Sequence, residues 1–244
     1  MNETIKQLYE RKSVRVFEDR EISGEDKKLI LEAAMMAPTA GNQQLYTILD
    51  ITDQEIKDHL AETCDHQPFI AKGKMVLIFC ADCSKWYEAF KEADCAPRFP
   101  GAGDLMLAVS DAVIAAQNAV TAAWSLGIGS CYIGDIMENC EIHRQLLKLP
   151  TYVFPAAMLV FGYPTRQQTE RPKPERAGLH HIVHENSYCR MSPDEYEMMF
   201  GPKTGHKSYQ EWMQAFCKRK YNSDFSREMT RSVETYLKDF FPHP

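Results

Sequence analysis

The sequence has 244 residues, enough for one large domain or two small ones with a substantial buried core. Its 44% hydrophobic and 25% charged residues are typical of a soluble globular protein, and its net charge of −6 argues against a nucleic-acid partner. Residues 1–13 lack the apolar stretch of a secretory signal, so we expect a cytoplasmic protein whose eight cysteines remain thiols.

Two helices and a polar loop are predicted before residue 45. Asn2 can cap a first helix, which ends at residues 11–17, RKSVRVF, where three cations surround Ser13. Ser23 begins a capping-box pattern that opens a second helix, and Pro38 closes it. The loop PTAGNQQ follows, and its small and amide side chains permit the close approach of a ligand.

The next part of the chain predicts two strands and an irregular segment. Strands are expected at 45–51 and 75–80, because six consecutive apolar residues suit a buried strand. Between them, a second capping box at Thr52 predicts a short helix. Residues 84–103 mix aromatic side chains, prolines and charges without a firm period, so we expect an irregular segment that covers a ligand or fills the core.

The stretch 105–126 predicts a helix that is apolar on nearly every face, with Asp111 as its one ionisable residue. It is long enough to cross a bilayer, but its polar residues and its lack of basic flanks favour a core or subunit-interface helix. Gly127 is expected to end the helix, and residues 127–135, GIGSCYIGD, to form an extended turn. A dinucleotide fingerprint needs a strand before the glycines, so that interpretation is rejected.

The remaining elements complete an α+β order. We predict a helix at 138–147, a strand at 156–161, a surface arm at 164–190 and two amphipathic tail helices, around 209–216 and 229–237. Mixed helices and strands of this kind favour a mixed sheet with helices on both faces. The arm has nothing local to pair with, so it is expected to wrap a second subunit.

Three polar clusters share one chemical character. Guanidinium groups suit a phosphate dianion, and amides suit the donor–acceptor edge of a heterocycle. The clusters therefore suggest a phosphorylated planar cofactor. They consist of Arg11, Ser13 and Arg15; of Lys173 and Arg176; and of Asn42, Gln43 and Gln44.

No metal site is expected. The CxxC of Cys80 and Cys83 has no matching second pair for zinc, so core thiols are the default interpretation. His180, His181 and His184 lack a carboxylate frame. The sequence also contains no Ser-His-Asp elbow, P-loop lysine or HExxH motif, which leaves hydrolase and kinase functions without support.

Five segments in the same order resemble the FMN-dependent nitroreductase family. The resemblance implies an α+β fold in which a mixed central β-sheet is flanked by helices, and an intertwined homodimer with FMN at its interface. We predict an FMN-binding domain at 1–190 and a helical extension, 191–244, packed on it; the extension lies outside the resemblance. The segments are RKSVRVF at 11–17, APTAGNQQ at 37–44, GIGSCYIGD at 127–135, FGYP at 161–164 and the RPKPER…IVHENSY run at 171–188.

The resemblance also implies which residues bind the cofactor. Arg11 would take the phosphate and Arg15 would lie near the pyrimidine edge. Ala40 stands where a hydroxyl residue is common, and the spacing leaves Lys173 and Arg171 as alternatives. The implied set is Arg11, Lys12, Ser13 and Arg15 from one subunit; Pro38, Thr39, Ala40 and Asn42 from the other; the backbone of Ile133, Gly134 and Asp135; and Lys173 with Arg176 at the phosphate.

The implied activity is hydride transfer from NADH or NADPH through FMN to an electron-poor small molecule, a nitroaromatic or a quinone, by a ping-pong mechanism. The flavin carries the chemistry, so no side chain is expected to act as acid or base. The acceptor is expected beneath Trp86, Tyr87 and Phe90. A reductive dehalogenase, a flavin-degrading enzyme and a flavin-binding protein without turnover remain as alternatives.

Overall fold

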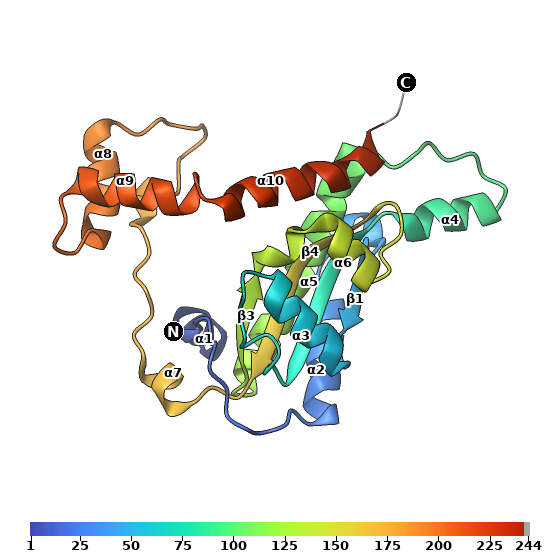
Figure 1. Ribbon diagram of the computed structural model, residues 1–244, viewed down its shortest axis with the longest axis horizontal. Coiled ribbons are helices and arrows are strands. Elements are labelled where there is room, and N and C mark those ends of the chain that lie inside the picture. The colour runs from blue at the N-terminus through green and yellow to red at the C-terminus, as the bar shows by residue number, and fades with distance from the viewer. Residues whose placement is uncertain (242–244) are drawn as a thin grey trace. The chain divides into compact units, whose positions relative to one another are not determined.

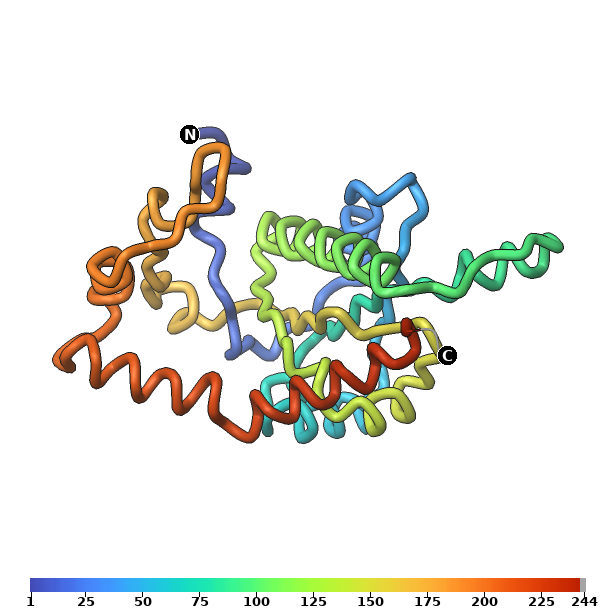
Figure 2. Tube along the Cα trace, turned by 90° about the horizontal axis from the view of Figure 1, so that it is seen from above, coloured from blue at the N-terminus to red at the C-terminus, as the bar shows by residue number. Residues whose placement is uncertain are grey.

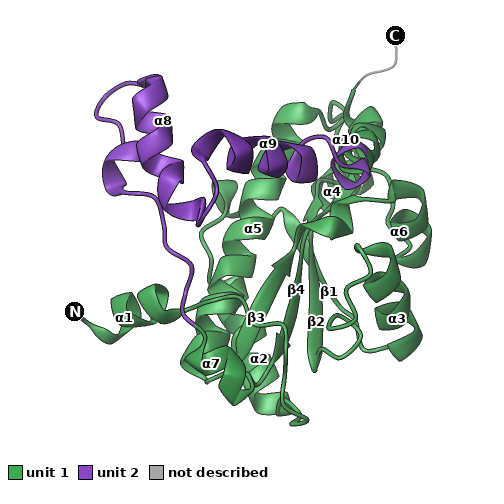
Figure 3. Cartoon of the chain, turned by 60° about the vertical axis from the view of Figure 1, so that its left-hand side comes forward, with its two compact units in different colours: residues 1–171, 228–244 green, residues 172–227 purple. Residues whose placement is uncertain are grey.

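The computed structural model describes residues 1–241, and the chain forms two compact units. The first consists of residues 1–171 together with the residues from 228 onward, and the second of residues 172–227 (Figure 3). The division of the chain at residue 190 into a cofactor domain and an extension stays a prediction.

One antiparallel sheet forms the centre of the first unit. Its strand order is β1-β2-β4-β3, so β1 and β3 are the two edges, and every position of β2 and β4 is buried. Within the described residues, parallel pairing occurs at the isolated bridge between Ser13 and Ser130. The expected α+β fold with a sheet flanked by helices is confirmed, but the four strands pair antiparallel and not in the mixed arrangement that we predicted. The strands are β1 (Tyr46–Asp50), β2 (Met75–Asp82), β3 (Gly129–Ile133) and β4 (Val153–Gly162).

The prediction of an extended glycine turn at 127–135 was wrong, because Gly129–Ile133 of this segment form strand β3. Gly129 has no room for a side chain, since a Cβ atom there would lie 2.6 Å from Cγ2 of Val14. Val14 is fully buried, and its N–H donates to the carbonyl of Ser130 at 2.9 Å. The glycine thus lets the segment around residue 14 lie against the sheet edge.

The long apolar helix is confirmed as α5 (Ala102–Ser125), which contacts all four strands (Figures 1 and 2). Its length and composition would also suit a membrane span. Its buried positions are mostly alanine, which allows close approach to the sheet, and Asp111 is buried among them. Its opposite side exposes Met106, Val113 and Ile114.

Helices cover both faces of the sheet. Helices α2 and α5 lie on one face, and α3 and α6 on the other (Figure 3). The predicted caps Asn2 and Ser23 are confirmed, because each side chain accepts a backbone N–H three residues later. The remaining helices of this part of the chain are α1 (Glu3–Glu10), α2 (Gly24–Met35), α3 (Gln54–Thr63), α4 (Ser84–Glu92), α6 (Cys140–Leu146) and α7 (Arg166–Glu170).

Three local predictions were wrong. Asp53, not Thr52, caps α3, because its carboxylate accepts the N–H groups of Glu55 and Ile56. The segment 84–103 contains the regular helix α4 rather than irregular chain, and the arm at 164–190 contains the short helix α7.

The second unit contains two helices and the start of a third. Helices α8 (Pro193–Phe200) and α9 (Tyr209–Lys220) both begin with a serine capping box, and α8 was not predicted. Helix α10 (Asp224–Leu237) continues into the first unit. There Tyr236 is fully buried, and its ring packs edge-on against Phe154 at 5.2 Å.

A buried carboxyl group lies where β3 leads into α6. Glu138 is 4% exposed. Burial, followed by the charges of Asp135, Asp65 and Glu228, raises its pKa to about 7 from an ordinary value of 4.5. In the pH range between these values the folded chain holds a proton that the unfolded chain releases. The stabilisation from this proton is complete below about pH 4.5 and is lost as the pH rises through 7.

Replacing Glu138 with Gln should remove this pH dependence. Between pH 5 and pH 8 the wild-type free energy of unfolding should fall by on the order of 2 kcal/mol more than that of Glu138→Gln, measured by urea titration. Glu62→Gln, at an exposed position of α3, is the control and should follow the wild type. Equal slopes for the wild type and Glu138→Gln would contradict the assigned protonation.

Candidate functional site

The cationic segment 11–15 lies against the edge strand β3. Ser13 forms a bridge with Ser130, which fixes the register of the segment on the strand. Burial raises the pKa of the Cys131 thiol, and the guanidinium groups of Arg15 and Arg11 oppose this rise. Both cations therefore lie close enough to β3 to place a positive potential on it.

The same segment is fastened to the chain that follows β4. Lys12 donates from Nζ to the carbonyls of Thr169, at 2.6 Å, and Arg171. Arg171 in turn donates to the carbonyl of Ser13 at 2.7 Å. The side chain of Gln168 accepts the N–H of Arg15 at 3.2 Å. Lys12 thus holds the segment in place, and two of its three N–H groups are already used.

Gln168 was not among the predicted site residues, and Arg171 entered the prediction as the alternative to Lys173. Gln168 is buried although it lies in a charged, proline-rich stretch, and nothing in the local pattern distinguishes it from its exposed neighbours. Its contact with Arg15 spans 153 residues. Only the fold brings the two positions together.

The loop before β1 is held by a buried carboxylate. Asp111 of α5 is 3% exposed and accepts three hydrogen bonds: from the hydroxyl of Thr39, from the N–H of Ala40 at 3.0 Å and from the N–H of Leu45 at 3.2 Å. The hydroxyl of Thr39 also accepts the N–H of Gln44 at 2.8 Å. Because its side chain is used inside the loop, Thr39 has mainly its backbone to offer a ligand.

The tip of this loop has an unusual backbone. Gly41, Asn42 and Gln44 all have φ near +50° to +57°, in the left-handed region. Side-chain-bearing residues adopt this region at a cost, so the loop needs outside support. Asp111 supplies it. The predicted residues Pro38 and Asn42 are exposed on the loop surface, while Ala40 is half-buried.

The predicted backbone group lies at the far end of β3. Ile133 is the buried last residue of the strand, and Gly134, which is exposed, begins the short 3₁₀ helix η2 (Gly134–Met137). Asp135 is half-buried in η2. The cations at 11–15 and these residues therefore share one edge strand.

The structure divides the predicted residues of the first unit into two groups. One group, residues 11–15 and 133–135, lies along β3. The other group lies in the loop before β1, which is the strand at the opposite edge of the sheet. Strands β1 and β3 are three strand spacings apart, which corresponds to about 14 Å. Lys173, half-buried, and Arg176, exposed, belong to the second unit, and their phosphate role stays a prediction.

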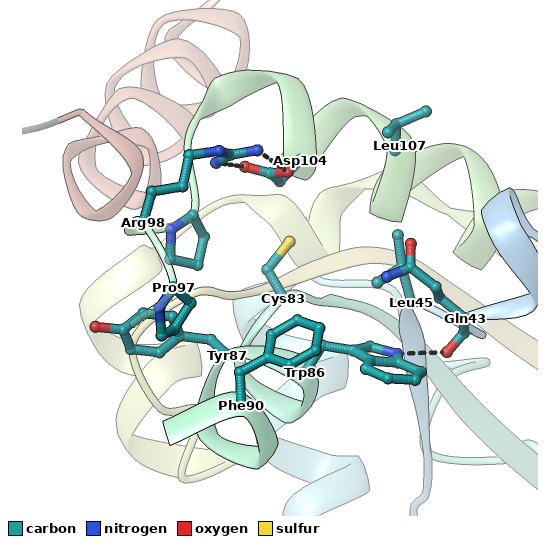
Figure 4. A pocket seen from close by; sticks show the side chains of 11 residues that line it. Gln43, Leu45, Cys83, Trp86, Tyr87, Phe90, Pro97, Arg98, Asp104 and Leu107 are labelled. Atoms are coloured by element: carbon teal, nitrogen blue, oxygen red, sulfur yellow. Dashed lines mark hydrogen bonds and ion pairs between the residues drawn. The ribbon is translucent and has the colours of Figure 1, made fainter. Parts of the chain in front are cut away.

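The three predicted acceptor contacts lie on α4. Trp86, Tyr87 and Phe90 line one cavity together with Gln43 from the loop (Figure 4). The indole N–H of Trp86 donates to the carbonyl of Gln43 at 2.8 Å. The cavity therefore borders the loop that Asp111 holds.

The thiols of Cys80 and Cys83 are not activated as nucleophiles. Burial, and after it a nearby carboxylate, raises the pKa of both Cys80 and Cys83 to about 12. Such thiols stay protonated at neutral pH and are poor nucleophiles. Among residues 1–241 no group of three or more His, Cys, Asp or Glu side chains is arranged to hold a metal ion.

Removing the carboxylate of Asp111 should loosen the loop. Asp111→Ala leaves one buried and two half-buried donors without their acceptor, so we expect a loss of about 3 kcal/mol in the free energy of unfolding. Asp111→Asn keeps one acceptor oxygen and should lose less. Urea titration measures both, with Ser110→Ala, the exposed neighbour on α5, as the control. A loss for Asp111→Ala no larger than that of the control would contradict the assignment.

Comparison with known proteins identifies the family of this chain. The chain is 31% identical over 248 residues to the FMN reductase [NAD(P)H] of Bacillus subtilis, covering 100% of this chain and 94% of that protein. It is 33% identical over 188 residues to the oxygen-insensitive NADPH nitroreductase of Salmonella typhimurium, covering 77% and 75%. The solved structure of NfrA2 from B. megaterium superposes with a TM-score of 0.82 at 29% identity and covers all of both chains. The family model described as Nitroreductase family matches residues 8–163, and the chain belongs to that family.

Proposed function

We propose that this chain is an FMN-dependent oxidoreductase that passes hydride from NADH or NADPH to an electron-poor small molecule. The relatives named FMN reductase and NADPH nitroreductase support the reaction class. The observation in the structure that carries the proposal is the placement of the cationic segment 11–15 beside β3, the strand that ends at Ile133, through the bridge from Ser13 to Ser130. A nitroaromatic or a quinone is the proposed acceptor, in a ping-pong sequence with NAD(P)H.

The residues present fit FMN by their chemistry. Guanidinium groups at Arg11 and Arg15 offer paired donors that suit a phosphate and an electron-rich pyrimidine edge. The loop tip exposes Asn42 and the backbone around Gly41, which can approach a heterocycle closely. Together these supply a phosphate clamp, an amide edge and a small-residue wall.

FMN, when bound, accepts and donates the hydride, so the chain contributes binding and electrostatics. Arg15 would place a positive charge near the pyrimidine edge, where negative charge develops on reduction. Lys12 would keep that segment in register on β3 through its bonds to the chain after β4. Asp111 would hold the loop that carries Thr39 to Asn42.

A homodimer completes the site. The loop group and the β3 group lie at opposite sheet edges within one chain, so one planar cofactor would contact both most simply across two copies. The exposed apolar residues Met106, Val113 and Ile114 on α5 offer a surface for such pairing. We place the protein in the cytoplasm, a compartment that suits eight free thiols.

Arg11 should matter for cofactor affinity. Arg11→Gln removes a charge-assisted contact to the phosphate, so we expect FMN affinity to fall about 10- to 100-fold. Fluorescence titration of the purified protein with FMN measures the dissociation constant. Lys28→Gln removes one exposed positive charge from α2 and serves as the control. Unchanged FMN affinity in Arg11→Gln, or a wild-type protein that ignores FMN, would contradict the proposal.

A further inference from the structure

The cavity beside α4 has walls that suit a planar ring. Its volume is about 330 Å³, in the range of small-molecule sites. The rings of Trp86 and Phe90 lie 5.6 Å apart, and Tyr87 contributes a third ring (Figure 4). Pro97, Pro100 and Leu107 complete the apolar lining. Aromatic faces with few rotatable bonds favour a flat, apolar ligand.

The cavity is fastened to the loop before β1. Besides the indole bond of Trp86 to Gln43, the Nζ of Lys85 donates to the carbonyl of Tyr46 at 2.6 Å and to that of Gln44 at 3.3 Å. These three bonds attach helix α4 to the loop. A ligand in this cavity lies next to the residues proposed to hold FMN.

The charged lining residues of the cavity neutralise each other. Arg98 forms a two-pronged ion pair with Asp104, with N–O distances of 2.6 and 2.9 Å. Asp104 also accepts the N–H of Gly101 at 2.8 Å and so caps α5. Bonding to Arg98 holds the pKa of Asp104 below its ordinary value, which keeps it an anion. The lining therefore carries no net charge.

This balance distinguishes ligands by charge. An anionic ring loses its hydration on entering the cavity and finds no surplus positive charge there to compensate. It is also repelled by the carboxylate of Asp104. A neutral ring avoids both costs. Three of the five N–H groups of Arg98 serve Asp104 and the carbonyl of Phe99, which leaves two for a nitro or quinone oxygen.

We propose that this cavity is the acceptor subsite, that it selects neutral planar aromatic compounds over anionic ones, and that Asp104 is the residue that determines this selectivity. The proposal rests on the proposed function, and it assigns the acceptor class and the residue that sets it.

The test uses 4-nitrobenzamide and 4-nitrobenzoate, two rings that differ in charge and little in shape. Equilibrium dialysis against the oxidised holoenzyme, without NAD(P)H, gives both dissociation constants. The wild type should bind the amide about three- to tenfold more tightly. Asp104→Asn, which keeps an acceptor oxygen for Gly101, should bring the two constants together. Arg98→Gln exposes the carboxylate and should widen the difference.

Glu88→Gln is the matched control, because it removes an exposed carboxylate from α4 outside the lining of the cavity. It should leave the amide-to-benzoate ratio unchanged. In turnover assays with NADPH, Asp104→Asn and Arg98→Gln should change the preference between amide and benzoate through KM and not through kcat. A wild-type preference for benzoate, or equal ratios in Asp104→Asn and Glu88→Gln, would overturn the proposal.

The binding measurement separates this proposal from the proposed function. If the ratios shift as expected while no acceptor oxidises NADH or NADPH, the cavity selects neutral rings but the oxidoreductase activity fails. If turnover occurs but Asp104→Asn and Arg98→Gln do not shift the amide-to-benzoate ratio in opposite directions, the activity stands and the assignment of Asp104 is wrong.

Discussion

The structure depends on one carboxylate that is buried in the long central helix α5. Asp111 accepts hydrogen bonds from residues that are 66 to 72 positions away, and so ties the loop before β1 to α5. The cost of burying this charge is offset only if all its bonds are made together. That requirement fixes the backbone of Thr39 to Asn42, including its left-handed tip. The loop then carries both the predicted cofactor contacts and, through Gln43, the anchor of Trp86.

A second constraint operates at the opposite sheet edge. Gly129 admits Val14, and the bridge from Ser13 to Ser130 sets the cationic segment along β3. The chain after β4 then fastens it through Lys12. The cation half of the proposed site thus lies along a strand, and the loop half is tied to a helix through Asp111. Rigid support of this kind is what a cofactor site needs to hold geometry.

The sequence predicted much of the fold because its signals were local. Asn2 and Ser23 act within one helical turn, and the apolar stretch of α5 needs no partner to be recognised as a core helix. Two of the wrong predictions, those of β3 and α4, depended on features outside the local sequence. The glycines of β3 resembled a turn until Val14 supplied the reason for Gly129. Helix α4 was missed because its aromatic residues face a cavity and not a core.

The residues of the candidate site likewise divide into those that local motifs predicted and those whose role depends on distant contacts. The motifs of the family predicted which residues would gather around a cofactor, but not what holds them in place. Asp111 was visible in the sequence as the one ionisable residue of the stretch 105–126, yet its role needs partners that only folding brings near. Gln168 gave no local signal at all. The pairing of Arg98 with Asp104 depends on how the segment after α4 returns to α5.

The account makes one central claim, that each cofactor site takes its cations from one copy of the chain and its loop from another. Complementation tests it directly. Arg11→Gln damages the cation half and Asp111→Ala the loop half, so chains carrying one change each can be co-expressed with different tags and purified as mixed pairs. A shared site predicts that one of the two sites in a mixed pair binds FMN with wild-type affinity. If mixed pairs bind FMN no better than either parent variant, the site lies within a single chain and the claim is wrong.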